Sequence, residues 1–317
     1  MGAEEERDGV TLTNLDQPLF DGAGATKRDL VDYLDAVSDR ILPALRDRPL
    51  SVIRVVRGQP PFMQKNLPRY TPDWVHTTTV WAEASKREVT YALCDDRRTL
   101  LWFANQRAVE YHPGLVLAGR WGVQTHLVLD LDPPSPDAFG MAVGAAHVVR
   151  QALAEVSMAG AVKTSGAKGL HVFVPLAEER VEDVAAVGRA IAARAERLDP
   201  ALVTTAFMRE ERGGKVFVDS TRVGGATVAA AYSPRIRPGT PVSFPIRWED
   251  LDGVAPADFT ITTATRLIAA GPSWEELMPA PQALPPDVTE EGHAIPVARV
   301  QAMHEGKRRA RARRDDG

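Results

Sequence analysis

The spacing of hydrophobic residues along the chain predicts a few long helices among many short strands. Apolar positions recur every three or four residues from Thr26 to about Leu45, and Thr26 and Asp29 form a capping-box pair at the start of this helix. Further helices are expected over residues 99–108, 135–157 and 182–198.

Short apolar runs bounded by glycine and proline predict the strands. They cover residues 50–56, 74–81, 88–94, 126–132, 161–164 and 170–175, a strand that ends at Asp219, and another that follows Gly224–Gly225 toward Tyr232. The sequence shows no internal repeat, and its strands and helices do not alternate as in a regular βαβ array. The expected fold class is therefore α+β.

Composition is that of an ordinary globular protein. The chain has 317 residues, 44% hydrophobic and 25% charged, enough for one large domain or two closely packed lobes. With a net charge of −4, any nucleic-acid binding must rely on local basic patches. Cys94 is the single cysteine, so we expect a buried structural thiol in a reducing cytoplasm. No signal peptide or membrane-spanning apolar run is recognisable, so no membrane partner is expected.

The two ends differ from the middle of the chain. Residues 1–10 are expected to be a disordered N-terminus, and residues 11–278 to form the folded domain. Residues 279–317 combine a proline-rich strap, Pro279–Pro286, with a basic tail, Lys307–Arg314. The tail is either a solvated, frayed helix or an electrostatic tether to nucleic acid, and the sequence favours neither.

Two carboxylates end the apolar strand that runs to Pro133. Asp130 and Asp132 are two residues apart, so they project from the same face of a strand. An Asp-x-Asp pair alone is more often a turn or a cap. On a hydrophobic strand, however, unpaired charge is costly, which favours a metal site completed by Asp219. Mg²⁺ and Mn²⁺ prefer oxygen ligands, and two such ions about 3.5–4 Å apart can activate a hydroxyl and stabilise a leaving phosphate.

A glycine-containing loop follows, with residues suited to an anion. Gly166 and Gly169 allow tight turns and a close approach of backbone N–H groups, and Lys168 adds charge. Ser165 and His171 add side-chain donors. The spacing is not that of a Walker A loop, and a plain strand–turn–strand connection is the alternative. Together with the upstream acids, the loop predicts triphosphate binding.

Three further features are ambiguous on their own. Arg235 and Arg237 alternate on an extended segment, which suits either phosphate binding or a solvated strand edge. Phe62 and Lys65 follow a Pro-Pro break and could stack on a base beside a phosphate, although such a phenylalanine is usually core. His112 has no partner at zinc-site spacing, so a structural role is the default.

The ordered motifs resemble the polymerase domain of bacterial DNA ligase D, within the archaeo-eukaryotic primase superfamily. The resemblance covers roughly residues 12–272, in the blocks Gly24–Tyr33, Arg48–Lys65, Leu101–His112, Val128–Pro133, Lys163–Leu176, Lys215–Asp219 and Ala226–Trp248. It implies a primase-polymerase fold, with central mixed or antiparallel sheets flanked by helices and an active-site cleft between two closely packed lobes.

The resemblance also implies an activity and a set of roles. Members extend a primer 3′-hydroxyl with NTPs or dNTPs by two-metal catalysis, often favour ribonucleotides and Mn²⁺ over Mg²⁺, and bind gaps with a downstream 5′-phosphate. The implied catalytic and metal-binding residues are Asp130, Asp132 and Asp219. The implied nucleotide-binding residues are His112, Ser165, Gly166, Lys168, Gly169, His171, Arg235 and Arg237. The implied DNA-binding residues are Lys27, Phe62 and Lys65.

Two segments depart from the pattern of this family. Asp16-Gln17 stands where the family has Asp-Lys, so the charge that helps to read a 5′-phosphate is lost, although Lys27 is retained. Tight 5′-phosphate recognition is therefore not carried over. The segment after Asp219, Ser-Thr-Arg-Val-Gly-Gly, also differs, and no residue role is transferred to it.

The expected function is that of a stand-alone, monomeric paralogue that fills short gaps or extends ends during end joining or excision repair. Its expected partners are DNA with a gap, nick or 3′ overhang, a separate DNA ligase and a Ku-like end-binding protein, in the cytoplasm at the nucleoid. The first alternative is a DNA-end binding or bridging module with weak or lost catalysis. The second is a metal-dependent phosphohydrolase.

Overall fold

The computed structural model describes residues 4–82 and 86–297 and confirms the α+β class. Buried hydrophobic residues form two large clusters, one around the N-terminal helices and one around the longest strands. The chain therefore has two lobes, which share partly buried residues such as Phe244. The basic tail Lys307–Arg314 lies outside the described residues.

The N-terminal lobe is built on a five-stranded antiparallel sheet. Its strands are β3 (Leu50–Arg54), β4 (Phe62–Gln64), β5 (Thr77–Ala82), β6 (Arg87–Ala92) and β7 (Ala108–Pro113). β3 pairs with β4, β6 and β7, and β5 continues the sheet beyond β6. The helices α1 (Lys27–Ala36), α2 (Ser38–Leu45) and α3 (Arg97–Asn105) contribute to the same core.

The C-terminal lobe contains a seven-stranded mixed sheet in the order β12-β13-β9-β11-β10-β14, with β8 paired to β9. The strands are β8 (Val116–Leu117), β9 (Arg120–Asp132), β10 (Ala161–Thr164), β11 (Leu170–Arg180), β12 (Val203–Thr204), β13 (Val216–Asp219) and β14 (Pro245–Ile246). Only β12 and β13 are parallel among these described pairs.

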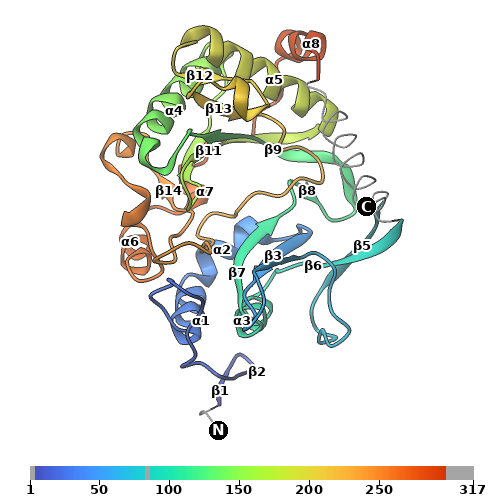
Figure 1. Cartoon of the computed structure of the whole chain (residues 1–317). Helices are drawn as coiled ribbons and strands as arrows, with labels where there is room; N and C mark the ends of the chain where they lie inside the picture. The colour runs from blue at the N-terminus through green and yellow to red at the C-terminus, as the bar shows by residue number, and fades with distance from the viewer. Residues whose placement is uncertain (1–3, 83–85, 298–317) are drawn as a thin grey trace, which may run out of the picture.

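The remaining helices are α4 (Phe139–Ala154), α5 (Val181–Leu198), α6 (Ala264–Ala270), α7 (Trp274–Leu277) and α8 (Pro286–Ala294), with 3-10 turns at Pro136–Ala138, Arg209–Glu211, Leu251–Gly253 and Pro256–Asp258. Figure 1 shows α4, α5 and α8 on the far side of the β9–β11 sheet from α1 and α3. None of the helices in the described ranges is long and apolar enough to cross a membrane.

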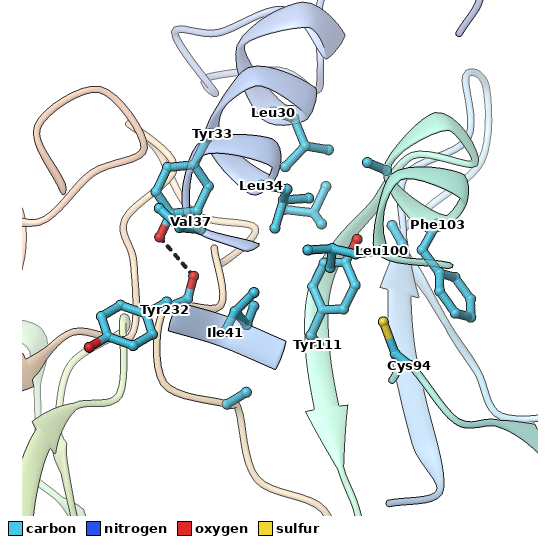
Figure 2. Close-up of a cluster of buried hydrophobic side chains, with 14 of the residues drawn as sticks. Leu30, Tyr33, Leu34, Val37, Ile41, Cys94, Leu100, Phe103, Tyr111 and Tyr232 are labelled. Atoms are coloured by element: carbon cyan, nitrogen blue, oxygen red, sulfur yellow. Dashed lines mark hydrogen bonds between the residues drawn. The ribbon is translucent and has the colours of Figure 1, made fainter. Parts of the chain in front are cut away.

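The first predicted helix is in fact two helices. α1 ends at Ala36, because its C-cap Val37 has a φ of −105° and a ψ of 10°, outside the helical range, and α2 starts at Ser38. The hydrophobic spacing does not reveal this bend, because Leu34 and Ile41 on either side of it are buried in the same core. Figure 2 shows both helices beside this cluster, with the Tyr33 hydroxyl donating to the carbonyl of Tyr232 at 2.8 Å.

Two other predicted elements need correction. The helix expected over 99–108 ends at Asn105, and Ala108 already belongs to β7. The strand expected toward Tyr232 is not formed, and residues 226–232 have no regular structure apart from one isolated bridge, Gly114 to Thr227, and a turn at residues 231–232. No ladder forms because successive N–H groups of this segment bond to different parts of the chain. The N–H of Ala230 donates to the carbonyl of Tyr111, whereas the N–H of Tyr232 donates to the carbonyl of Ser243.

The ends of the described chain are more ordered than the sequence predicts. Within the N-terminal segment expected to be disordered, β1 (Glu5–Arg7) pairs with β2 (Val10–Leu12), and Arg7 forms ion pairs with Asp32 and Asp35 on α1. The proline-rich segment does act as a strap. The backbone of Gln282 hydrogen-bonds to Pro175 and Ala177 along β11, and α8 follows against α5.

Cys94 is fully buried in the N-terminal core, as expected of a structural thiol. Burial raises the pKa of this thiol well above its usual value, and the nearby Asp96 and Asp95 act in the same direction. A thiol held in its protonated form is a poor nucleophile. Cys94 therefore contributes packing to the cluster in Figure 2.

Candidate active site

The three predicted acids lie on neighbouring strands of the C-terminal sheet. Asp219 on β13 is directly opposite Asp130 on β9, and Phe217 is opposite Asp132. In an antiparallel pair, residues directly opposite each other point to the same face of the sheet. The register therefore gathers all three carboxylates at one end of these strands, as the sequence predicted for Asp130 and Asp132.

Asp130 and Asp219 converge on one cationic nitrogen. The Nη2 atom of Arg222 lies 3.0 Å from Oδ2 of Asp130 and 3.2 Å from Oδ2 of Asp219. Asp132 instead lies 3.6 Å from the Nζ of Lys168. In the two described ranges, no three His, Cys, Asp or Glu side chains converge as a ready-made ligand set. A pair of carboxylate oxygens around one stand-in cation nevertheless fits a hard divalent ion.

The Asp130 carboxylate is electrostatically unusual. Burial raises its pKa, the charge of Arg222 opposes this rise, and Asp132 and Asp219 add to it, so that the pKa of Asp130 is about 6. A nearby positive charge favours the ionised form, while desolvation and neighbouring acids disfavour it. Asp130 is therefore a strong cation ligand whose ionisation depends on what occupies the space beside it.

The loop between β10 and β11 is shaped by its glycines and by Ser165. Gly166 has a φ of +68°, and a Cβ at Gly169 would lie 2.1 Å from the carbonyl oxygen of Leu131. The Ser165 Oγ accepts hydrogen bonds from the N–H groups of Ala167 and Gly169, both at 3.2 Å. Its own proton remains available to a ligand. The loop is thus preformed rather than shaped by a substrate.

Lys163 and His171 form a fully paired buried unit behind this loop. The Nζ of Lys163 contacts Nδ1 of His171 at 2.7 Å, the carbonyl of Ala229 at 2.9 Å and Oγ of Ser243 at 2.6 Å. The Ser243 hydroxyl already donates to the carbonyl of Thr164, so it accepts from Lys163. A lysine ammonium has three donors and three acceptors meet it here. Burial lowers the pKa values of both Lys163 and His171 well below their usual values. Where Lys163 donates to Nδ1, the neutral imidazole carries its proton on Nε2, which lies 3.6 Å from Asp130.

Glu110 joins two predicted nucleotide-binding residues. Its Oε2 accepts from Nε2 of His112 at 2.8 Å and from Nε of Arg235 at 3.0 Å, while Oε1 accepts from the N–H of Ile236 at 2.8 Å. Arg235 also donates to the carbonyl of Ser165. Burial alone would raise the pKa of Glu110, but the His112 hydrogen bond and the charge of Arg235 hold it at about 2. Glu110 therefore stays ionised and fixes both partners.

Most of the predicted site residues line a single cavity of about 970 Å³. They are His112, Asp130, Asp132, Ser165, Gly166, Lys168, His171, Arg235 and Arg237. Gly169 is a buried residue of the loop itself. Asp219 does not line the cavity but forms an ion pair with Arg222, which does. Within residues 4–82 and 86–297, the exposed side chain of Arg237 makes no hydrogen bond or ion pair, so its charge faces the cavity unpaired.

The predicted DNA-binding residues lie outside this lining. Phe62 is 37% exposed on β4, where its neighbour Met63 does line the cavity, and Lys65 is exposed just beyond that strand. Lys27 is instead turned inward. Its Nζ donates to the Thr13 carbonyl at 2.5 Å and to Asn105 Oδ1 at 2.6 Å. Burial, aided by the charge of Arg107, lowers the pKa of Lys27 to about 8.

The sequence alone did not single out Arg222, Glu110 or Lys163. Lys163 had one detectable signal, because it is a charged residue inside the otherwise apolar predicted strand of residues 161–164. Glu110 lies between Val109 and Tyr111 in a stretch for which the sequence predicted no element. Arg222 had no such signal, because a charged residue in a turn is usually solvated.

Comparisons with known proteins agree with this geometry. The family model described as LigD, primase-polymerase domain, matches residues 26–274. The multifunctional non-homologous end joining DNA repair protein LigD of Mycobacterium tuberculosis H37Rv is 37% identical over 268 residues, which are 80% of this chain and 34% of that protein. The bifunctional non-homologous end joining protein LigD of Bacillus subtilis is 34% identical over 261 residues, 80% and 41% of the two chains.

A solved structure is also similar over most of its length. The polymerase domain from Mycobacterium tuberculosis ligase D in complex with DNA matches with a TM-score of 0.76 and 34% identity, covering 86% of this chain and 98% of that one. The present chain spans roughly a third of the length of the LigD proteins of Mycobacterium bovis and Mycobacterium tuberculosis. These findings confirm the predicted resemblance: the chain belongs to the primase-polymerase domain family of LigD, a family of nucleotidyltransferases.

Proposed function

We propose that this protein is a metal-dependent, template-directed nucleotidyl transferase that extends a primer 3′-hydroxyl during DNA repair. One observation carries the proposal. Carboxylates from β9 line the same cavity as the cationic and hydroxyl groups of the 165–171 loop and of Arg235 and Arg237. A cavity with acids on one wall and phosphate-binding groups on another suits a nucleoside triphosphate held beside divalent ions.

Asp130, Asp132 and Asp219 would hold Mg²⁺ or Mn²⁺ at the ends of β9 and β13. When bound there, such ions lower the pKa of an attacking hydroxyl and neutralise charge on a leaving pyrophosphate. To do so, the acids must exchange their present cationic partners, Lys168 and Arg222, for the ion. Their oxygens are otherwise well matched to a hard cation.

The protein side chains would orient the triphosphate. Ser165 has a free hydroxyl proton, His171 presents its Nε2 proton, and Lys168 and Arg237 supply charge at the same cavity. Arg235 is held by Glu110, so it would act as a fixed donor, whereas Arg237 is free to follow the phosphates. Preorganised donors of this kind stabilise charge that develops during phosphoryl transfer.

The proposed DNA substrates are gaps, nicks and 3′ overhangs. The exposed ring of Phe62 beside Met63 could stack on a template base, with Lys65 near the backbone phosphate. A 5′-phosphate would reach Lys27 only by replacing Thr13 and Asn105 as its partners, and Gln17 adds no charge there. Weak 5′-phosphate recognition therefore belongs to the proposal, as do action with a DNA ligase and a Ku-like protein, and a place in the cytoplasm at the nucleoid.

Primer extension on a gapped duplex with Mn²⁺ tests the proposal. Asp130→Ala should abolish extension, while Asp137→Asn, an exposed acid five residues beyond Asp132 in the chain, should leave it unchanged. Equal extension by wild type and Asp130→Ala would refute it. Gap binding without any turnover by wild type would favour a DNA-end binding module. Release of phosphate from an NTP without primer would favour a phosphohydrolase.

A further inference from the structure

Arg222 occupies the space between the carboxylates of the proposed metal site. It comes from the turn directly after β13, and its Nη2 bridges Asp130 and Asp219 at 3.0 and 3.2 Å. The other oxygen of Asp219 accepts from the N–H and the hydroxyl of Thr221 at 2.8 and 2.6 Å. Asp219 therefore has one oxygen left for a cation, and Arg222 holds it.

We propose that Arg222 is an internal counter-ion, which holds the acidic site together in the metal-free protein and is displaced when a divalent cation binds. This inference rests on the metal-dependent function proposed above.

The two cations compete for the same oxygens. Divalent ions of this kind bind carboxylate oxygens at about 2.0–2.2 Å. Asp130 and Asp219 would hold a divalent ion through carboxylate oxygens that the guanidinium of Arg222 now contacts. The divalent ion and the Arg222 guanidinium would also repel each other strongly if both contacted the same carboxylates in this partly buried site. Binding of the ion therefore requires Arg222 to leave.

Arg222 is also able to leave. Its side chain is 36% exposed, and its ion pairs in the described part of the chain are those with the two acids. The acids themselves are only 14% and 8% exposed. Without either cation the two carboxylates would lie close together and poorly solvated, an arrangement that disfavours their charged forms. The arginine thus stabilises the site before metal arrives, at the expense of metal affinity.

Mn²⁺ affinity of the full chain, measured without nucleotide or DNA, tests this directly. Titration followed by electron paramagnetic resonance should give a dissociation constant at least about tenfold lower for Arg222→Gln than for wild type, because the competing charge is removed. Arg222→Lys, which keeps the charge on a shorter side chain, should fall between them. Arg237→Gln is the matched control, because Arg237 lines the same cavity but contacts neither acid.

Thermal unfolding supplies a second readout that a merely structural role would not give. Metal-free Arg222→Gln should melt below the wild type, because its acids lack a counter-ion. Saturating Mn²⁺ should then raise its Tm by more than it raises that of wild type. A structural arginine would lower the Tm by the same amount with and without Mn²⁺, and that result would overturn the inference.

The binding outcomes separate this inference from the proposed function. Tighter binding by Arg222→Gln alone supports the counter-ion role. Unchanged affinity in Arg222→Gln, or an equal gain in Arg237→Gln, overturns it while leaving a metal-dependent enzyme intact. Absence of Mn²⁺ binding in wild type and every variant would overturn both.

Discussion

The Nζ of Lys163 lies 2.7 Å from Nδ1 of His171, on adjacent strands whose register places the two residues directly opposite each other. Both side chains are buried, and the other two acceptors of Lys163 come from Ala229 and Ser243. The tautomer of an imidazole is set by the partner of its other nitrogen. Lys163 therefore determines which ring nitrogen of His171 can donate a hydrogen bond to a substrate.

Replacing Lys163 by methionine should release His171 from this tautomer. In ¹⁵N spectra of histidine-labelled protein, we expect wild type to show a protonated Nε2 and an unprotonated Nδ1, and Lys163→Met to show a mixture. The nucleotide KM should rise, and stability should fall by about 1–3 kcal/mol because buried acceptors lose their donor. Ser243→Ala, which keeps the Lys163–His171 contact, should retain the wild-type spectrum.

Glu110 should contribute stability that depends on pH. Its pKa is about 2 in the folded protein and 4.5 for the free side chain, so the unfolded chain binds the proton more tightly. The contribution is therefore complete above pH 4.5 and is lost as pH falls toward 2. The shift corresponds to roughly 3 kcal/mol. Urea unfolding should show Glu110→Gln strongly destabilised at pH 7, with the difference from wild type shrinking at pH 3.

An exposed acid supplies the control for that measurement. Glu210→Gln removes a similar charge from the surface of the 3-10 turn Arg209–Glu211, where a substitution usually changes stability by less than about 0.5 kcal/mol. A pH-independent loss in Glu110→Gln would mean that the carboxylate matters through its shape alone.

Mn²⁺ binding should weaken as the solution is acidified. The raised pKa of Asp130, about 6, means that this ligand must release a proton to bind a cation below that pH. The affinity should be nearly constant above pH 7 and fall by up to about tenfold per pH unit below 6. Calorimetry in two buffers of different ionisation enthalpy measures the released proton, and a release that does not grow between pH 7 and pH 5.5 would contradict this assignment.

Gly169 should tolerate no side chain. A Cβ there would lie 2.1 Å from the carbonyl oxygen of Leu131 on β9, so Gly169→Ala must push the loop away from the strand that carries the acids. We expect a fall in Tm of several degrees, corresponding to about 1–3 kcal/mol, and a higher nucleotide KM. Gly140→Ala on α4, where a Cβ meets nothing within 4 Å, should instead be neutral or slightly stabilising.

Much of this site could be predicted from the sequence, because the period of a strand places Asp130 and Asp132 on one face. Strand register is a tertiary property, however, and only the structure shows Asp219 opposite Asp130. The pairing of Arg222 with both acids depends on that register, so no local pattern could reveal it. Lys163 was visible only as a charge in an apolar predicted strand, without any indication of its partners, and Glu110 was not marked by any predicted element.

The path of the backbone was harder to predict than the residues of the candidate site. The apolar spacing of residues 26–45 is continuous, yet the backbone bends at Val37, because both halves pack on one core. The stretch before Tyr232 has a strand-like composition, yet its N–H groups bond in turn to Tyr111 on β7 and to Ser243, which precedes β14. A segment that passes between two sheets cannot satisfy both as a regular ladder strand.

Glu110 also helps to fix the two lobes relative to each other. It lies on β7 of the N-terminal lobe, and Arg235 connects it to Ser165 on the loop of the C-terminal lobe. A hinge motion that separated the two lobes would leave the buried Glu110 carboxylate without its Arg235 partner, at a cost of about 3–5 kcal/mol. We therefore expect the two lobes to keep their relative positions while a nucleotide enters and leaves the cavity.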